Sequence, residues 1–240
     1  MSEIYSTKGD GNLNNVEKID KFTNWVYSEI KPHLKGRILE IGSGIGTYSK
    51  KISNDFKPNG KVFTDIDVEY VSQLKSTFKS DSTVSIQQLD LTFPDFSIFE
   101  KNSFDSAFAL NVLEHIEDDM SALNNVYHML KHHGLFVLLV PAHKFLYNCI
   151  DRDIGHFRRY SEKEMLEKIS RTKFKLRKLH YFNFLSILGW YIHGNILKKS
   201  LVDEKALGFL NKIVPFLKFL EKNILRKKIG ISLIVVLEKE

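Results

Sequence analysis

The sequence lacks the features that define several common classes of protein. Cys149 is the only cysteine, which excludes a disulfide-stabilised scaffold and a zinc finger built on thiolate ligands. The first residues are polar and contain no apolar run of the length that a signal peptide needs, so we expect a cytoplasmic protein. Hydrophobic residues make up 43% of 240 positions, which excludes a mostly disordered chain and indicates one domain with a substantial core.

Acidic residues are scarce in one part of the chain only. The whole sequence has 35 Lys and Arg against 29 Asp and Glu, a net charge of +6. Residues 171–240 contain 15 basic and 5 acidic residues, whereas residues 1–170 contain 20 and 24. The basic C-terminal part therefore indicates either an anionic partner, such as lipid headgroups or a nucleic acid, or a solvated lysine-rich face.

Short apolar runs alternate with segments of helical periodicity. Runs of strand length occur at 37–41, 61–65, 84–90, 104–110, 135–140, 174–181 and 230–237. Strands that alternate with helices predict an α/β fold, here a Rossmann-like, seven-stranded, mostly parallel sheet with helices on both faces. The long stretch before the last strand predicts a helical insertion.

A glycine-rich loop directly follows the first predicted strand. Its sequence is Gly42-Ser43-Gly44-Ile45-Gly46, and its glycines allow a tight turn and a close approach of a ligand to backbone N–H groups. A dinucleotide fingerprint requires glycine at the position of Thr47 instead. The GxGxG spacing, with Glu40 two residues before the loop, resembles the first motif of class I S-adenosylmethionine (SAM)-dependent methyltransferases.

The resemblance implies further contacts to the cofactor S-adenosyl-L-methionine at successive strand ends. Asp65 would accept the ribose hydroxyls, with Asp67 as the alternative, and Asp90 would contact the adenine amino group. The implied cofactor-binding residues are Glu40, Gly42, Ser43, Gly44, Gly46, Asp65, Ile66, Asp90, Leu91, Leu110 and Asn111.

The resemblance covers residues 22–180 and extends to a bacterial branch of the family, marked by Asn24-Trp25, His143 and the segment 151–160. That branch is often encoded near glycosyltransferases, which implies a small or a glycan- or lipid-linked acceptor. The resulting layout has an N-terminal helical segment covering the cofactor site, a SAM-binding core, a helical cap or membrane-interface insertion, and the last core strand, at 1–36, 37–184, 185–229 and 230–240.

An oxygen acceptor of high pKa needs a general base, and histidine suits this role near neutral pH. We expect His156 first and His143 second, because both follow the fifth predicted strand. His115 is either catalytic or packed near the cofactor. Tyr160 either donates a hydrogen bond to the acceptor or packs in the interior.

Three residues are predicted to contact the acceptor: Trp25, Arg158 and Arg159. Adjacent arginines suit an anionic group, although they would equally form a clasp with Asp151 or Asp153. Three further histidines, at 128, 132 and 133, lie around a predicted helix end, where positive charge is favourable. We therefore expect no metal.

Two other functions stay open from the sequence. The basic C-terminal part suggests an RNA methyltransferase, although no Asn/Asp-Pro-Pro-Tyr/Phe motif is present. A non-catalytic SAM-binding regulatory subunit would keep the cofactor acids and would not need His156.

The insertion has two apolar segments. Leu179–Leu197 contains no Lys, Arg, Asp or Glu over 19 residues, but its polar residues argue against a transmembrane helix. Ala206–Leu225 combines an apolar face with flanking lysines and contains Pro215, which predicts a kink. This segment is either a cap over the active site or a helix on an anionic bilayer.

Overall fold

The computed structural model of the chain describes residues 20–56, 60–94, 99, 101–198, 204–225 and 227–240. Its strands are β1 (Ile38–Ile41), β2 (Lys61–Asp65), β3 (Val84–Gln88), β4 (Phe104–Leu110), β5 (Leu130–Pro141), β6 (Phe174–Phe182) and β7 (Ser232–Lys239). Its α-helices are α2 (Asp20–Ile30), α3 (Thr47–Asp55), α4 (Val68–Thr77), α5 (Asp119–Met129), α6 (Cys149–Asp153), α7 (Glu162–Ser170), α8 (Ser186–Tyr191) and α9 (Glu204–Leu220). Short 3-10 turns lie at Lys31–His33, Leu113–His115 and Lys144–Leu146, and π-helical turns lie at Ile192–Ile196 and Glu221–Leu225.

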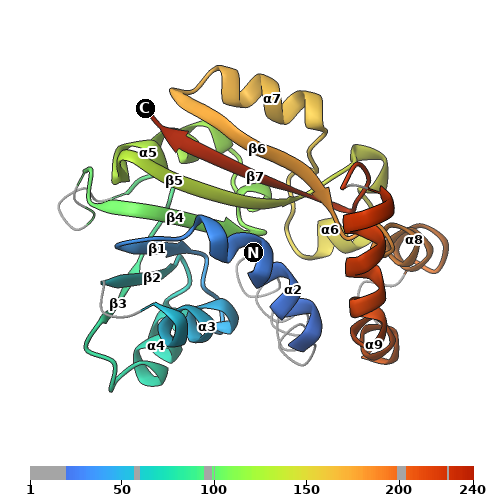
Figure 1. The fold of residues 1–240 in the computed structure, drawn as a ribbon, viewed down its shortest axis with the longest axis horizontal. Coiled ribbons are helices and arrows are strands. Elements are labelled where there is room, and N and C mark those ends of the chain that lie inside the picture. The colour runs from blue at the N-terminus through green and yellow to red at the C-terminus, as the bar shows by residue number, and fades with distance from the viewer. Residues whose placement is uncertain (1–19, 57–59, 95–98, 100, 199–203, 226) are drawn as a thin grey trace.

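All seven strands form one sheet in the order β3-β2-β1-β4-β5-β7-β6 (Figure 1). The strands from β3 to β5 pair in parallel, and β7 runs antiparallel to both β5 and β6. The predicted Rossmann-like α/β fold is therefore confirmed. Because β1, β2 and β4 are parallel neighbours, the loops that follow them meet at one edge of the sheet, the carboxyl edge.

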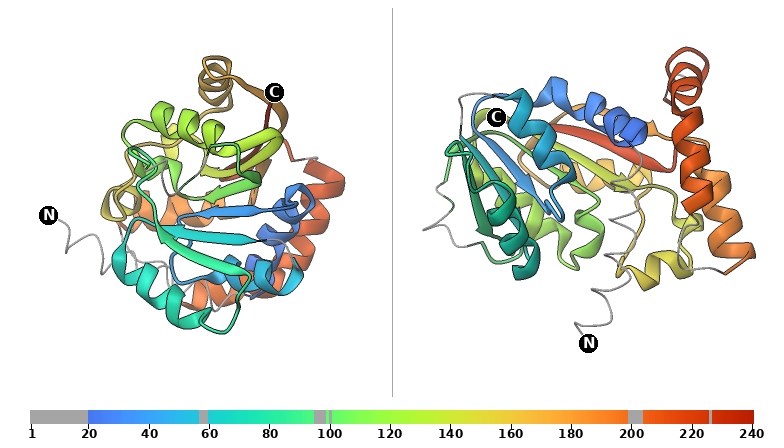
Figure 2. Two further views of the ribbon diagram at one scale, coloured as in Figure 1. Left: turned by 90° about the vertical axis from the view of Figure 1, so that its left-hand side faces the viewer. Right: turned by 90° about the horizontal axis from the view of Figure 1, so that it is seen from below.

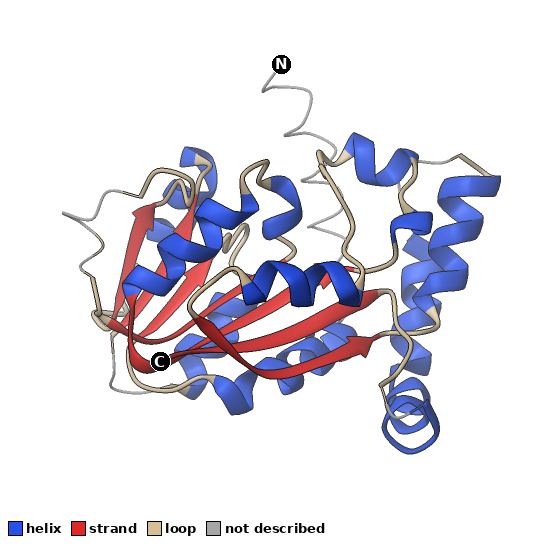
Figure 3. Cartoon of the chain, turned by 90° about the horizontal axis from the view of Figure 1, so that it is seen from above, coloured by secondary structure: helices blue, strands red, loops and turns tan. Residues whose placement is uncertain are grey.

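Helices cover both faces of the sheet (Figure 3), and the buried residues accordingly fall into two clusters. Alternate side chains of the central strands enter opposite clusters: Phe136 and Leu138 of β5 pack with α5 and α7, whereas Val137 and Leu139 pack with α2 and α9. β7 alternates in the same way. The continuous apolar runs of these strands are explained by burial on both faces.

The N-terminal helix packs on the sheet. The buried face of α2 joins the same cluster as Ile38, Phe108 and Val137. Residues 1–19, which carry most of the predicted cover over the cofactor site, lie outside the described residues.

Two helices of the insertion, α8 and α9, lie together at one end of the molecule (Figures 1 and 2). α9 continues through Pro215, whose missing N–H removes one i→i−4 hydrogen bond, and then passes into the π-helical turn Glu221–Leu225. None of the helices in the described residues is both long enough and apolar enough to cross a membrane.

Candidate active site

The glycine loop leaves β1 in a left-handed backbone conformation that glycine adopts without strain. Gly42, Gly44 and Gly46 have φ angles of 71°, 52° and 82°. A Cβ at Gly42 would collide with the side chain of Val112, so the loop after β4 lies directly against the glycine loop. The N–H of Ser43 donates to the carbonyl of Thr64 at 2.8 Å, which holds the start of the loop against the end of β2.

Glu40, at the end of β1, contacts the helix that follows the glycine loop. Its side chain is buried, and its Oε2 accepts a hydrogen bond from the hydroxyl of Ser49 at 2.5 Å. Burial raises the pKa of Glu40 to about 8. The structure therefore gives Glu40 a contact to α3, and this contact fixes where the helix begins relative to the strand.

Asp65 closes β2 beside the loop and is mostly buried. Its Oδ2 accepts from the N–H of Gly44 at 2.8 Å, and its Oδ1 accepts from the N–H of Asp67 at 3.0 Å. Each oxygen keeps a lone pair for a further hydrogen bond. By contrast, Asp67 is the N-cap of α4, and its Oδ1 accepts from the N–H of Glu69 at 2.8 Å. Of the two acids, Asp65 has the better position to receive a ribose.

The residues predicted to contact the adenine of the cofactor follow β2 and β3 and include both apolar and acidic side chains. Ile66 is 61% exposed although it is apolar, and it directly follows Asp65. Asp90 is exposed two residues beyond the end of β3, and its Oδ1 accepts from the N–H of Thr92. Leu91 is buried, and its carbonyl accepts from the side chain of Asn125 at 2.9 Å.

The end of β4 supplies the remaining predicted cofactor residues. Asn111 has a φ of 54° and donates its N–H to the carbonyl of Leu139, so the chain turns sharply out of the sheet beside β5. Leu110 is half-buried and Asn111 is exposed. This turn faces the glycine loop through Val112, which places the three strand ends around one site.

A cluster of ionisable side chains follows β4 and β5. His156 is buried, its Nδ1 lies 2.8 Å from Oδ1 of Asp151, and its Nε2 lies 3.6 Å from Oε1 of Glu114. The rings of His115 and His156 meet edge to face, with centroids 4.6 Å apart. The N–H of Phe157 donates to the carbonyl of Glu114, which joins the two segments.

The protonation of this cluster is perturbed. Burial raises the pKa of Glu114 to about 8. Desolvation of the ring, followed by repulsion from His156, lowers the pKa of His115 to about 4, although the residue as a whole is exposed. His115 is therefore neutral at physiological pH.

A family model described as a methyltransferase domain matches residues 39–136, which include the glycine loop, Asp65 and Asp90. The segment 39–136 is a class I SAM-dependent methyltransferase domain. Its predicted cofactor, S-adenosyl-L-methionine, is thereby confirmed. Asp65 and the glycine loop fit this cofactor, because a partly accessible carboxylate suits the ribose hydroxyls and the loop brings backbone N–H groups close to it.

Known structures share the fold of the methyltransferase domain. An S-adenosylmethionine-dependent methyltransferase from Mesorhizobium loti is 14% identical, with a TM-score of 0.63 over 92% of this chain and 99% of its own. Phosphoethanolamine N-methyltransferase 2 of Haemonchus contortus, solved with S-adenosyl-L-methionine, is 16% identical, with a TM-score of 0.59 over 86% of this chain and 49% of its own.

Among curated proteins, the chain is 28% identical over 153 residues to the protein named Probable polyketide synthase 42 of Dictyostelium discoideum. The match covers 55% of this chain and 6% of that protein. The chain thus spans less than a tenth of the length of the first curated relatives that it matches.

The histidines predicted as bases separate into two places. His115 and His156 lie together, whereas His143 stacks on the ring of Tyr181, with centroids 5.1 Å apart and planes 3° from parallel. Burial lowers the pKa of His143. Its φ of 64° marks the turn at which the chain leaves β5.

Two of the three predicted acceptor contacts, Arg158 and Arg159, have internal partners instead. Arg159 is buried and its Nε donates to Oδ1 of Asp151 at 2.8 Å, which is the clasp that the sequence left open. Arg158 pairs with Asp119 at 3.0 Å. Because both guanidinium groups are already paired with carboxylates, the structure gives no support to their predicted role in binding an anionic acceptor.

Two aromatic predictions are corrected by burial. Trp25 is 3% exposed and packs on Phe182 with ring centroids 4.5 Å apart, so it belongs to the core rather than to the acceptor site. Tyr160 is fully buried, and its hydroxyl donates to Asp119 or to the carbonyl of Leu113. Its packing role, also considered from the sequence, is the one that the structure supports.

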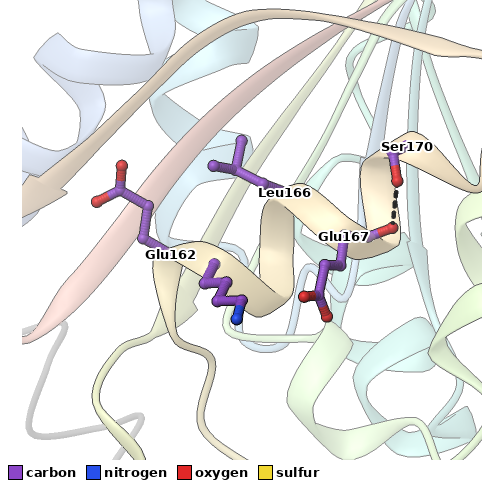
Figure 4. Close-up of a pocket in the computed structure, with 5 residues that line it drawn as sticks. Glu162, Leu166, Glu167 and Ser170 are labelled. Atoms are coloured by element: carbon purple, nitrogen blue, oxygen red, sulfur yellow. Dashed lines mark hydrogen bonds between the residues drawn. The ribbon is translucent and has the colours of Figure 1, made fainter.

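Sequence reasoning missed Glu114 as a site residue and gave Asp151 no role toward His156. Both belong to segments that the sequence singled out, but burial and pairing decide their roles, and these depend on the fold. An open depression on α7 is a weaker candidate (Figure 4). Its lining residues Glu162, Lys163, Leu166, Glu167 and Ser170 all come from that one helix, which lies beside β6.

Proposed function

We propose that the chain transfers the methyl group of SAM to an oxygen atom of a small or lipid-linked acceptor. One observation carries the proposal: His156 is buried, its ring is oriented by the carboxylate of Asp151, and it lies at the same carboxyl edge of the sheet as the glycine loop. Asp151 fixes the Nδ1 side of His156, so that Nε2 faces Glu114 and His115.

The reaction is an in-line displacement. The acceptor oxygen forms a bond to the methyl carbon while the carbon–sulfur bond breaks, and its electron pair returns to sulfur as the sulfonium becomes a neutral thioether. The proton of the acceptor hydroxyl is taken up by the cluster of ionisable side chains, in which His156 is the proposed general base. The glycine loop and Asp65 contribute by holding the cofactor, which converts the encounter into an oriented reaction.

The insertion borders the acceptor side of this site. The ring of Trp190 lies 4.6 Å from the guanidinium carbon of Arg159, and the side chain of Asn148 donates to Asn195 at 2.8 Å. These contacts connect the α8 region to the segment that holds His156. They support the cap alternative for this half of the insertion.

The second half of the insertion, which contains α9, has an exposed apolar surface that suits an enzyme with a lipid-linked acceptor. One face of α9 is anchored to α2, because Val214 and Leu217 are buried there. Part of the apolar face predicted for Ala206–Leu225 is therefore used for packing inside the protein. Instead, four large apolar side chains are at least 60% exposed, namely Phe209, Phe216, Phe219 and Ile224. We call these four residues the α9 apolar surface.

Lysines accompany the α9 apolar surface. Lys212 and Lys222 are exposed on the same helical segment. Exposed aromatic residues next to cations suit the interface of an anionic membrane. This arrangement supports a peripheral membrane contact that would bring the enzyme to a lipid-linked substrate.

The experiment for the reaction is a search for product. The purified chain is incubated with methyl-labelled SAM and fractionated extract, and products heavier by one methylene group are identified by mass spectrometry. His156→Ala should lose turnover and keep SAM affinity, with His132→Ala as the control. Labelled RNA as the sole product would replace the proposal with RNA methylation, and SAM binding without product from any fraction would favour the regulatory subunit.

The membrane contact is tested by flotation with vesicles of phosphatidylcholine alone or mixed with phosphatidylglycerol. Flotation should require the anionic lipid and should be lost when Phe216 and Phe219 are both changed to Ser. Equal flotation of the wild type and this variant would contradict the contact.

A further inference from the structure

Three potential metal ligands meet beside the proposed acceptor site. Glu114 and His115 end the 3-10 turn after β4, and His156 comes from the segment that follows α6. One ligand atom from each residue can be chosen so that all three lie within 4.8 Å of one another. Side chains from separated parts of the sequence therefore converge on one point.

Glu114 provides the independent indication of a missing ligand. The residue is fully buried, and neither of its carboxylate oxygens has a hydrogen-bond partner in the described part of the chain. A buried carboxyl group without a hydrogen-bond partner is costly whether it is ionised or protonated, and a bound cation would compensate the ionised form. Its nearest cationic candidate is His156 Nε2 at 3.6 Å, which is longer than a hydrogen bond.

The surroundings resemble the outer shell of a metal site. Histidine ligands usually donate their second ring nitrogen to a carboxylate, which fixes the orientation of the ring. Here Nδ1 of His156 contacts Asp151 at 2.8 Å. Asp151 in turn accepts from Nε of Arg159 and from the N–H of Asn148, so the carboxylate is rigidly held.

We propose that Glu114, His115 and His156 bind one divalent transition-metal ion, with Zn²⁺ as the best match to two imidazoles and one carboxylate. Ligand atoms around a tetrahedral Zn²⁺ are about 3.4 Å apart, given bonds of about 2.1 Å. The 3.6 Å between His156 Nε2 and Glu114 Oε1 is close to that separation. The sequence indicated no metal and gave His115 and His156 as candidate catalytic residues, so this site was not predicted.

A tetrahedral ion held by three side chains has a fourth ligand position, which solvent or the acceptor can occupy. Glu114 and His156 are buried, whereas His115 is exposed, so solvent or an acceptor reaches the site past His115. The catalytic part of the proposal rests on the proposed function. With the ion bound, His156 would be a ligand and no longer the general base; the ion would make a coordinated acceptor hydroxyl more acidic, and its proton would pass to water.

Metal binding is measured on the full chain without SAM, so that its result is independent of methyl transfer. The metal-free protein is titrated with Zn²⁺ by calorimetry, and Co²⁺ is added separately to record visible absorption from a protein-bound ion. One Zn²⁺ per chain is expected. Glu114→Gln and His115→Ala should each weaken binding at least 10-fold, and both should leave the circular dichroism spectrum unchanged.

His132→Ala is the matched control, because His132 is an exposed histidine outside the cluster. This variant should bind Zn²⁺ like the wild type. Absence of stoichiometric binding, binding that neither cluster variant weakens, or binding that only His132→Ala weakens would each overturn the proposal. Failure to bind S-adenosylhomocysteine in a parallel titration would instead count against the proposed function.

Discussion

Replacing Asp65 by Asn changes the proposed ribose contact with little change in volume. The carboxylate accepts one backbone N–H on each oxygen, from Gly44 and Asp67, and would accept the ribose hydroxyls in addition. Hydrogen bonds to charged groups contribute about 1.5–3 kcal/mol each. The amide keeps one acceptor oxygen and loses the negative charge, so we expect a loss of about 2–3 kcal/mol, or roughly 30- to 150-fold weaker binding.

The assay is calorimetric titration with S-adenosylhomocysteine, and Asp67→Asn is the matched control. Because an Asn at position 67 can still cap α4 through its side-chain oxygen, this variant should bind within about 3-fold of the wild type. Thermal unfolding of both variants shows whether the glycine loop remains folded. Equal affinity for Asp65→Asn and the wild type, or a larger loss for Asp67→Asn, would refute the assignment of Asp65 to the ribose.

Three further predictions concern stability. Burial raises the pKa of Glu40 from 4.5 to about 8, so between these pH values the folded chain holds a proton that the unfolded chain releases. The contribution of Glu40 to stability therefore decreases as pH rises from 4.5 to about 8. Glu40→Gln should remove this part of the pH dependence, measured by urea unfolding at several pH values, and an unchanged slope would contradict the prediction. Trp25→Ala should destabilise the fold by about 3–5 kcal/mol in the same assay, and a loss under 1 kcal/mol would argue against a core position. Arg159→Ala should destabilise by about 3–5 kcal/mol because it leaves Asp151 buried without its cation, whereas unchanged stability with a raised KM would restore the acceptor-binding role.

The fold was predictable from local patterns. The central strands contain continuous apolar runs, and a run that is buried on both faces, as in β5, needs no alternation of polar residues. The edge strands β3 and β6 instead contain polar residues and are only partly buried. The glycine loop was predictable for a related reason. Its three glycines all adopt positive φ angles, and such a requirement is visible in the sequence.

Side-chain partners were less predictable, because they depend on which distant segments meet. The sequence shows that Arg159 has acidic residues nearby, but only the structure shows that Asp151 pairs with Arg159 and also orients His156. Likewise, the apolar periodicity of α9 is clear, yet α2 determines which face is buried, and Phe216 remains exposed as a result. Long-range packing, rather than local propensity, decided these roles.

Titration of the full chain with S-adenosylhomocysteine tests the central claim most directly. A methyltransferase domain with an intact glycine loop, and with Asp65 at the end of β2 beside it, should bind one molecule per chain, and Asp65→Asn should weaken that binding. A wild-type chain that is folded by circular dichroism and yet binds neither S-adenosylhomocysteine nor SAM would contradict the account.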